Sequence, residues 1–463
     1  MQEYLKKSSC FFALIFLLFV IAVSLPGIFE TGEFLKDHLD TAYWSVRADR
    51  QVVYLPPAEE IPPPPICKNA EGAVSAAQKI KAPVRPEIKR EKGTAENKTF
   101  SPGIFDHGLF YKIRKKISPF IVERSAIENA VIENFPLRYE FSEYNMAFKY
   151  LLGVKQPVDG EDLRLGPDRM LSNIPDTDDC EAACYYADLA GKLSSRYIVV
   201  IEPWKTDFSG TEGFEFEVER RKLKITENIA ALKEHGAETV DLRDLFKSKN
   251  MMLSDIFYRG DHHWKTTAAL LAAEHLADYM NRNCHTDYDL RYLRKDAFLQ
   301  EIYRKIFIGS SAKKAGLAYT GEMEDFVVFT PLYQTKFEVD LIDRDLSMRH
   351  ISGDFRKLND YVNFYRDPYQ SNPYAFFTAG DKPFIKIKNQ YCRKTPKIAI
   401  LKNSFANAVI PYLALQTSEM LVFDERYMTM EKITEKLIEE RPDIIIYLNS
   451  KFDAYCKENN NNF

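Results

Sequence analysis

Two short runs of this sequence bring together residue types that could do acid-base and nucleophilic chemistry. In the first, Asp261 and His263 stand one residue apart within Arg-Gly-Asp-His-His-Trp. A carboxylate two positions from an imidazole can fix the ring's tautomer and orientation, which a general base requires from its partner. We therefore expect His263 to act as a general base that Asp261 holds in place. A purely structural hydrogen bond between the two side chains is the alternative.

A metal site is a further alternative for the same cluster. The adjacent histidines His262 and His263 are a poor start for one, because two neighbouring histidines rarely coordinate the same ion. The sequence also offers no His-x3-His or Cys-x2-Cys spacing beside them. We expect no metal site and no cofactor.

In the second run, Ser404 stands where an apolar strand pattern at 397–402 ends and a helical pattern begins. A serine at such a turn presents its hydroxyl at the carboxyl end of a parallel sheet, and its own N–H can stabilise an oxyanion. Taken alone, a serine here is more often a plain helix N-cap. The Asp261 cluster also follows a strand end, so one sheet would bring both runs to the same edge. We interpret Ser404 as the nucleophile.

The elements that must position these residues alternate between strand and helix patterns. Strand patterns cover residues 196–202, 238–242, 397–402, 420–424 and 443–448, helix patterns cover 216–235 and 431–440, and another helix starts near Phe405. Such alternation is typical of a parallel, doubly wound sheet. We therefore predict an α/β fold with a mostly parallel sheet.

Composition divides the rest of the chain into segments. Residues 103–455 have the composition of a folded domain, with an insertion at about 285–385 that is rich in Tyr, Phe, Asp and Arg. The insertion lacks clear periodicity, and we predict loops and a substrate-facing surface there. Residues 30–102 are predicted to be a membrane-proximal segment and Pro-rich linker, because the part from about 54 onward holds Pro56, Pro57 and the prolines at 62–65 and few large apolar residues. Residues 456–463 are a polar tail.

The N-terminus has the pattern of an export signal or a membrane anchor. Residues 1–9 form a cytoplasmic n-region, and residues 10–29 are largely apolar. We favour an uncleaved signal anchor over a signal peptide, because the apolar run can extend to Phe29 and no clean Ala-x-Ala site follows it. Lys6 and Lys7 precede the run, so the positive-inside rule places the remainder outside. We expect a membrane-anchored protein whose catalytic domain lies outside the cytoplasmic membrane, or a secreted one if the signal is cleaved.

Charge and cysteine content exclude two further classes of protein. The 463 residues carry 63 basic and 67 acidic side chains, for a formal net charge of -4. No broad basic face is therefore available for nucleic acid. Seven cysteines are too few for a disulfide framework. Cys180 and Cys184 could form a bridge, bind metal or do neither, and we expect mostly free thiols.

A resemblance to a known family extends over most of the chain. In order, the sequence contains Asp-His-His-Trp at 261–264, Gly309-Ser310, Lys-Lys-Ala-Gly at 313–316, the Asn389 segment, the strand ending in Ser404, and Phe-Asp-Glu-Arg-Tyr at 423–427. In these motifs the chain resembles the DHHW protein family, which is similar to the alginate O-acetyltransferase group with its SGNH-hydrolase-like domains. The resemblance implies a three-layer α/β/α SGNH-hydrolase-like domain, in addition to the N-terminal membrane segment.

The same resemblance implies roles for individual residues. It makes Ser404 the nucleophile, His263 the base and Asp261 its partner, while His262 is not in the matching position. The implied activity is an extracytoplasmic, serine-dependent O-acyl (acetyl) transfer to a cell-surface carbohydrate polymer. In that setting a separate multi-spanning membrane protein delivers the acyl group.

Two alternatives to a transferase stay open. With water as the acceptor, the same triad is a carbohydrate esterase or deacetylase. A membrane-tethered carbohydrate-binding scaffold with an impaired site is the non-enzymatic alternative.

Five further residues are candidates for substrate or oxyanion contacts. Asn403 stands where relatives usually carry Asp; an amide can still donate a hydrogen bond but carries no charge, and this departure keeps the scaffold alternative open. Asn407 and Arg426 are candidates near the same strand ends. Trp204 and Trp264 each follow a strand end and could stack on sugar rings, with core packing as their alternative role.

Overall fold

The computed structural model describes residues 52–55, 138–158, 161–173, 178–208, 215–392, 395–449 and 452. The predicted membrane segment 10–29 and the polar tail 456–463 lie outside these residues. Across the part of the chain that is described, no helix is both long and apolar enough to cross a membrane.

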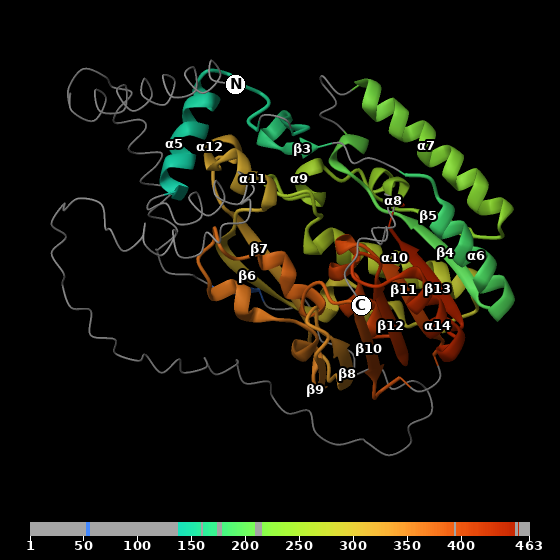
Figure 1. Cartoon of the computed structure of the whole chain (residues 1–463). Helices are drawn as coiled ribbons and strands as arrows, with labels where there is room; N and C mark the ends of the chain where they lie inside the picture. The colour runs from blue at the N-terminus through green and yellow to red at the C-terminus, as the bar shows by residue number, and fades with distance from the viewer. Residues whose placement is uncertain are drawn as a thin grey trace, which may run out of the picture. The chain divides into compact units, whose positions relative to one another are not determined.

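An eight-stranded mixed sheet forms the centre of the fold (Figure 1). Its parallel strands are β4 (Arg196–Ile201), β5 (Glu238–Asp241), β11 (Lys397–Lys402), β12 (Glu419–Asp424) and β13 (Ile444–Leu448). They lie side by side in the order β5-β4-β13-β11-β12. Each agrees with a predicted strand to within one residue at either end. Their carboxyl ends meet at one edge of the sheet, as the sequence pattern requires.

Three antiparallel strands extend the sheet beyond β12. They are β10 (Phe384–Asn389), β8 (Phe337–Ile342) and β9 (Met348–Gly353), in that order. The sheet is therefore mixed, with four parallel and three antiparallel pairs among its seven neighbouring pairs. β8 and β9 come from the predicted insertion, which thus supplies sheet as well as loops. β9 is a largely exposed edge strand, so it carries no apolar alternation that could have revealed it.

Helices cover both faces of the sheet in a three-layer α/β/α arrangement. Alternate side chains along a strand point to opposite faces: Ile398 and Ile400 enter one core, and Ala399 and Leu401 enter the other. The first core also holds buried side chains of α8 (Leu242–Ser248), α10 (Thr266–Asn283) and α13 (Ile410–Ala414), and the second those of α6 (Glu181–Leu193), α7 (Glu215–Glu234) and α14 (Met430–Glu440). Burying one aliphatic side chain contributes about 1.5–3 kcal/mol, so both cores hold the strands in register.

A second, antiparallel sheet is built from β1 (Val52–Leu55), β6 (Phe298–Phe307) and β7 (Glu324–Pro331). β1 belongs to the segment predicted as linker, so four residues of that segment pair with the folded part of the chain. Strands β2 (Leu163–Leu165) and β3 (Leu171–Asn173) form a separate pair.

The remaining helices of the described residues lie between these elements. The α-helices are α5 (Arg138–Leu151), α9 (Leu253–Ile256), α11 (Ser310–Ala315) and α12 (Leu317–Thr320). The 3-10 helices are η1 (Pro167–Arg169), η2 (Lys205–Asp207), η3 (Leu290–Tyr292), η4 (Lys295–Ala297), η5 (Phe355–Leu358), η6 (Tyr361–Tyr365), η7 (Pro373–Ala379) and η8 (Ser404–Ala408).

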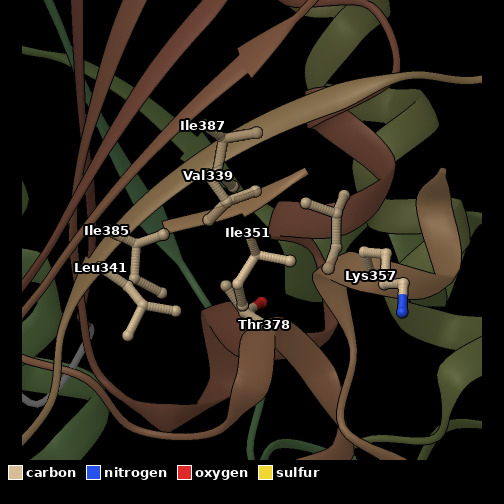
Figure 2. Close-up of a pocket in the computed structure, with 8 residues that line it drawn as sticks. Val339, Leu341, Ile351, Lys357, Thr378, Ile385 and Ile387 are labelled. Carbon is tan, nitrogen blue, oxygen red and sulfur yellow. The ribbon is translucent and has the colours of Figure 1, made fainter. Parts of the chain in front are cut away.

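One small cavity lies under the antiparallel end of the central sheet (Figure 2). Val339, Leu341 and Ile387 line it from the strands, with Thr378 on η7. Its volume of about 10 Å³ has room for one water at most. It is a packing gap and cannot hold a substrate.

Candidate active site

The loop between α9 and α10 carries the histidine cluster. An isolated antiparallel bridge joins Phe257 to Trp264 and closes this loop at its base. Both bridge residues are fully buried in the first core. Asp261, His262 and His263 therefore project from a turn whose two ends are anchored in apolar packing.

The structure brings Ser404, His263 and Asp261 together in one hydrogen-bonded chain. The Oγ of Ser404 lies 2.8 Å from Nε2 of His263, across 141 positions of sequence. Nδ1 of His263 lies 2.5 Å from Oδ1 of Asp261. Asp261 and His263 are buried, whereas Ser404 is partly exposed. This is the arrangement of a nucleophile, a general base and a carboxylate that orients the base.

Asp261 accepts two further hydrogen bonds, both from backbone N–H groups. The N–H of His263 donates to Oδ1 at 3.0 Å, and that of Ser310 donates to Oδ2 at 2.7 Å. Burial acts to raise the pKa of Asp261, but the imidazoles of His263 and His262 and the hydrogen bonds from the His263 ring and the Ser310 N–H hold it well below its usual value. The carboxylate is therefore ionised and oriented in the way that the base requires.

Two glycines allow the Asp261 loop to approach the Ser310 segment. A Cβ on Gly260 would lie 2.2 Å from the carbonyl oxygen of Ile308, and a Cβ on Gly309 would lie 2.3 Å from the carbonyl oxygen of Gly260. Gly309 also has a φ of +85°, a conformation that other residues rarely adopt. The contact between Asp261 and Ser310 depends on this backbone-to-backbone packing.

A buried lysine fastens the start of the same loop. Nζ of Lys205 donates to the carbonyl oxygens of Leu171, at 2.7 Å, and Arg259, at 3.0 Å. Burial lowers the pKa of Lys205 to about 7, although the nearby carboxylates of Glu324 and Asp261 act in the opposite direction. Lys205 thus ties β3 and the catalytic loop together from η2.

Aromatic rings hold the imidazole of His263. The ring of Tyr374, on η7, stacks on it with centroids 3.9 Å apart and planes inclined by 17°. The ring of His262 also has its centroid 3.9 Å away, inclined by 36°. Two rings this close cannot share one face, so they lie on opposite faces of His263. Trp204 in turn stacks on His262, at 5.9 Å.

The turn that carries Ser404 is shaped by the residue before it. Asn403 is the N-cap of η8, and its Oδ1 accepts from the N–H of Phe405 at 2.9 Å. Ser404 is the first residue of η8, a position whose N–H has no partner within the helix. That N–H is the donor next to the nucleophile that could stabilise an oxyanion.

Asn407 and Arg426 are engaged in a partly buried charge network. Nδ2 of Asn407 donates to Asp381 at 2.7 Å. Arg426 forks onto Asp424 at 2.8 and 2.6 Å and pairs with Asp381 at 2.8 Å. Asp424 also pairs with Lys402 at 2.6 Å, both fully buried. These partners give both candidates a structural role beside the strand ends.

The two tryptophan candidates lie in the core. Trp264 is fully buried and its Nε1 donates to the carbonyl oxygen of Phe405 at 3.1 Å. Trp204 is 3% exposed and packs against Phe405. Neither presents a face for a sugar ring, because each lies beneath the site, where it supports the Ser404 turn.

Sequence reasoning did not assign three residues that the site uses. Ser310 belongs to the Gly309-Ser310 motif, to which we assigned no role from the sequence. The glycines at 260 and 309, which allow two backbone segments to pack closely, are the signal that could have indicated one. Tyr374 lies in the aperiodic insertion, where no pattern distinguishes it. Glu202, which accepts a hydrogen bond from the Asn403 amide, directly follows β4 as a polar residue after an apolar run, and a carboxylate at a strand end was the available signal.

The donor atoms of Asp261, His262 and His263 lie within 4.8 Å of one another, a grouping that could hold a metal ion. The fit is poor, however. Oδ1 of Asp261 and Nδ1 of His263 are 2.5 Å apart, whereas two ligands each about 2.0 Å from a tetrahedral ion lie more than 3 Å apart. Nε2 of His263 is in turn hydrogen-bonded to Ser404, so both ring nitrogens are engaged in the hydrogen-bonded chain.

Comparisons with known proteins agree with the predicted resemblance. Residues 184–302 match the model of a family described as the SGNH hydrolase-like domain of the acetyltransferase AlgX. The matched part includes Asp261 and His263 and ends before Ser404. The matched part is thus similar to an SGNH hydrolase-like domain, and the chain itself has an α/β fold with a mixed central sheet. Among curated proteins, no sequence matches significantly.

Several solved structures are similar. PatB1 from Bacillus cereus is 16% identical, with a TM-score of 0.48, over 62% of this chain and 97% of PatB1. A DHHW family protein from Eubacterium siraeum is 16% identical, with a TM-score of 0.46, over 63% and 88%. The O-acetyltransferase domain of Pseudomonas putida AlgJ is 12% identical, with a TM-score of 0.35, over 64% and 94%. At TM-scores below 0.5, these likenesses carry no inference about activity.

Proposed function

We propose that this protein is a serine-dependent O-acyl transferase that acts outside the cytoplasmic membrane on a hydroxyl of a cell-surface carbohydrate. The acyl group that we propose is acetyl. The observation that supports this proposal most directly is the hydrogen-bonded chain of Ser404, His263 and Asp261. A site of this kind transfers acyl groups through a serine ester.

In the first half of the reaction, Oγ of Ser404 attacks the acyl carbonyl carbon while Nε2 of His263 accepts the hydroxyl proton. The imidazolium that forms is stabilised by Asp261, which stays ionised. His263 then gives the proton to the departing group, and the acyl group stays on Ser404 as an ester.

In the second half, His263 takes the proton of the acceptor hydroxyl as its oxygen attacks the ester carbon. The bond to Oγ breaks, and the proton returns to Ser404. In both halves the negative charge on the former carbonyl oxygen needs a donor, and we assign the backbone N–H of Ser404 to that task. The amides of Asn403 and Asn407 already donate within the protein.

The cellular setting is part of the proposal. The apolar segment at 10–29, preceded by lysines, supports an anchored chain with its site outside the membrane. An acyl donor must then reach that side, and a multi-spanning membrane protein is the partner class that can deliver it. A carbohydrate polymer is the proposed acceptor.

The decisive experiment measures hydrolysis of 4-nitrophenyl acetate by the purified chain and by Ser404→Ala and His263→Ala. Both variants should lose most of the activity, by about 10³-fold or more. Ser352→Ala, an exposed serine on β9, is the matched control and should keep full activity. An inert wild type, or an unchanged Ser404→Ala, would favour the scaffold alternative.

A second experiment separates transfer from hydrolysis. Acetyl-Ser404 is formed with the same ester, and its decay is followed with and without an oligosaccharide acceptor. Faster decay with formation of acetylated sugar identifies a transferase. Equal decay into acetate alone identifies an esterase.

A further inference from the structure

Three buried polar residues meet where the parallel strands end beside the nucleophile. Glu202 directly follows β4, Asn403 follows β11, and Asn449 follows β13. Their exposed fractions are 0%, 7% and 2%. The cost of burying such groups is offset only where hydrogen bonds satisfy them.

The side-chain amide of Asn403 both accepts and donates hydrogen bonds here. Its Oδ1 accepts from the N–H of Phe405, and its Nδ2 donates to Oε1 of Glu202 and, at 3.3 Å, to Oδ1 of Asn449. A carboxylate at position 403 could keep the first contact. It could not donate to Glu202, and its charge would face that of Glu202.

The charges around this group show how Glu202 is accommodated. Nδ2 of Asn449 donates to the buried carboxylate of Glu425 at 3.3 Å, so two amides separate two carboxylates. Arg221, on α7, is buried and paired with Asp207 at 2.6 Å. Burial lowers the pKa of Arg221, and the charge of Glu202 is among the interactions that act to raise it. Arg221 is thus a buried cation whose charge interacts favourably with that of Glu202, while its ion-pair partner is Asp207.

We infer that Glu202 is a positioning residue for the nucleophile, acting through the hydrogen bond that Asn403 donates to it. This inference rests on the proposed function. Glu202 fixes the Asn403 amide, the amide caps η8, and the cap fixes the direction of the Ser404 hydroxyl and N–H. Asparagine at position 403 is thus matched to a carboxylate across the strand ends and is compatible with full activity.

Four variants test the pairing on the purified full-length chain, with kcat and KM measured for 4-nitrophenyl acetate. Asn403→Asp sets two carboxylates against each other, and we expect kcat to fall about tenfold or more with little change in KM. Glu202→Gln still offers an acceptor to Asn403 and should stay within about threefold of wild type. The double variant restores a donor and an acceptor, and it should recover to within about threefold of Glu202→Gln.

The fourth variant, Asn403→Asp with Glu301→Gln, is the matched control. Glu301 is equally buried but pairs with Arg356 on η5, so its neutralisation should give no rescue. A double variant Asn403→Asp/Glu202→Gln that is as slow as Asn403→Asp alone overturns the inference. So does an Asn403→Asp variant as fast as wild type.

Two further measurements keep the outcome clear. If Asn403→Asp does not fold, kcat of Glu202→Ala is compared with kcat of Glu202→Gln. Only alanine removes the acceptor of the Asn403 hydrogen bond, so Glu202→Ala should be the slower of the two. Equal kcat for both variants overturns the inference. Unfolding of all variants in urea measures the coupling between positions 202 and 403 without reference to catalysis. An inert wild type with normal coupling would therefore count against the proposed function and remove the catalytic role of Glu202, while the contact itself would stand.

Discussion

The backbone N–H of Ser310 donates to Oδ2 of Asp261, while Oδ1 of the same carboxylate accepts from His263. The two oxygens of one side chain thus join a helix start after β6 to the catalytic loop. Because Asp261 is held from both sides, its position does not depend on His263 alone. The first three predictions concern this support and the packing around it.

Replacing Ser310 by proline removes that N–H donor. Proline is tolerated at the first position of a helix, which Ser310 occupies in α11. A hydrogen bond to a charged group contributes about 1.5–3 kcal/mol, so we expect kcat for 4-nitrophenyl acetate to fall about 10- to 100-fold. Ser310→Ala keeps the N–H and should retain activity. Equal loss in both variants would assign the effect to the hydroxyl instead.

Tyr374 should matter through its ring. Tyr374→Leu removes the stacking on His263, which is worth about 0.5–1.5 kcal/mol, and we expect a fall in kcat of about 2- to 12-fold at unchanged KM. Tyr374→Phe keeps the ring and loses only the hydroxyl, which lies 3.4 Å from the carbonyl oxygen of Phe405 and is hydrogen-bonded to Trp264, so it should remain close to wild type. Steady-state kinetics of the two variants give the comparison.

Gly260 should not tolerate a side chain. In Gly260→Ala, the new methyl group meets a backbone oxygen at 2.2 Å, which cannot yield without moving the loop. We expect a loss of about 1–3 kcal/mol in the free energy of unfolding, together with a loss of activity. Gly191→Ala is the control, because that helical glycine on α6 has nothing within 4 Å and should gain about 0.5–1 kcal/mol. Urea unfolding distinguishes the two.

Glu143 should make stability depend on pH. Burial raises its pKa from 4.5 to about 6, against the hydrogen bonds from Tyr369 and Leu317. The folded state therefore binds more protons between these two values, and stability falls as the pH rises from about 4.5 to 6. The cost is fully present above about pH 6 and amounts to at most about 2 kcal/mol.

Glu143→Gln should remove this dependence, because a neutral amide can still accept from the N–H of Leu317 and donate to Tyr369. We expect the variant to be more stable than wild type at pH 7 and equal to it at pH 4.5, measured by urea unfolding. Glu439→Gln, exposed on α14, should follow wild type at both values. A wild-type slope that persists in Glu143→Gln would assign the dependence to another group.

The sequence was sufficient for the parallel half of the fold. The apolar runs that became β4, β11, β12 and β13 are continuous because both faces of these strands are buried. Hydrophobic periodicity reports burial directly, so these elements agreed with their predicted bounds. The antiparallel strands β8 and β9 were missed. β9 is largely exposed and has no apolar alternation, whereas β8 buries Phe337, Val339 and Leu341 alternately, a period-2 pattern that the sequence did offer.

Part of the candidate site could likewise be predicted from the sequence. Asp261 and His263 are two residues apart, and Ser404 follows the end of a strand pattern, so local spacing and the strand boundary were enough to identify them. For Trp204 and Trp264, the sequence could not distinguish sugar stacking from core packing, because it does not show whether neighbouring segments cover these side chains. Their burial gives them a packing role.

What the sequence by itself determined was therefore local: which residue types stand at which strand ends, and that these ends share one edge. What only the tertiary structure decided were the contacts made across long separations. Ser310 reaches Asp261, Tyr374 stacks on His263, and Asn403 donates to Glu202. Each depends on the close packing of segments distant in the chain, and no periodicity encodes such a pairing, because hydrogen bonds and ring contacts depend on position in space.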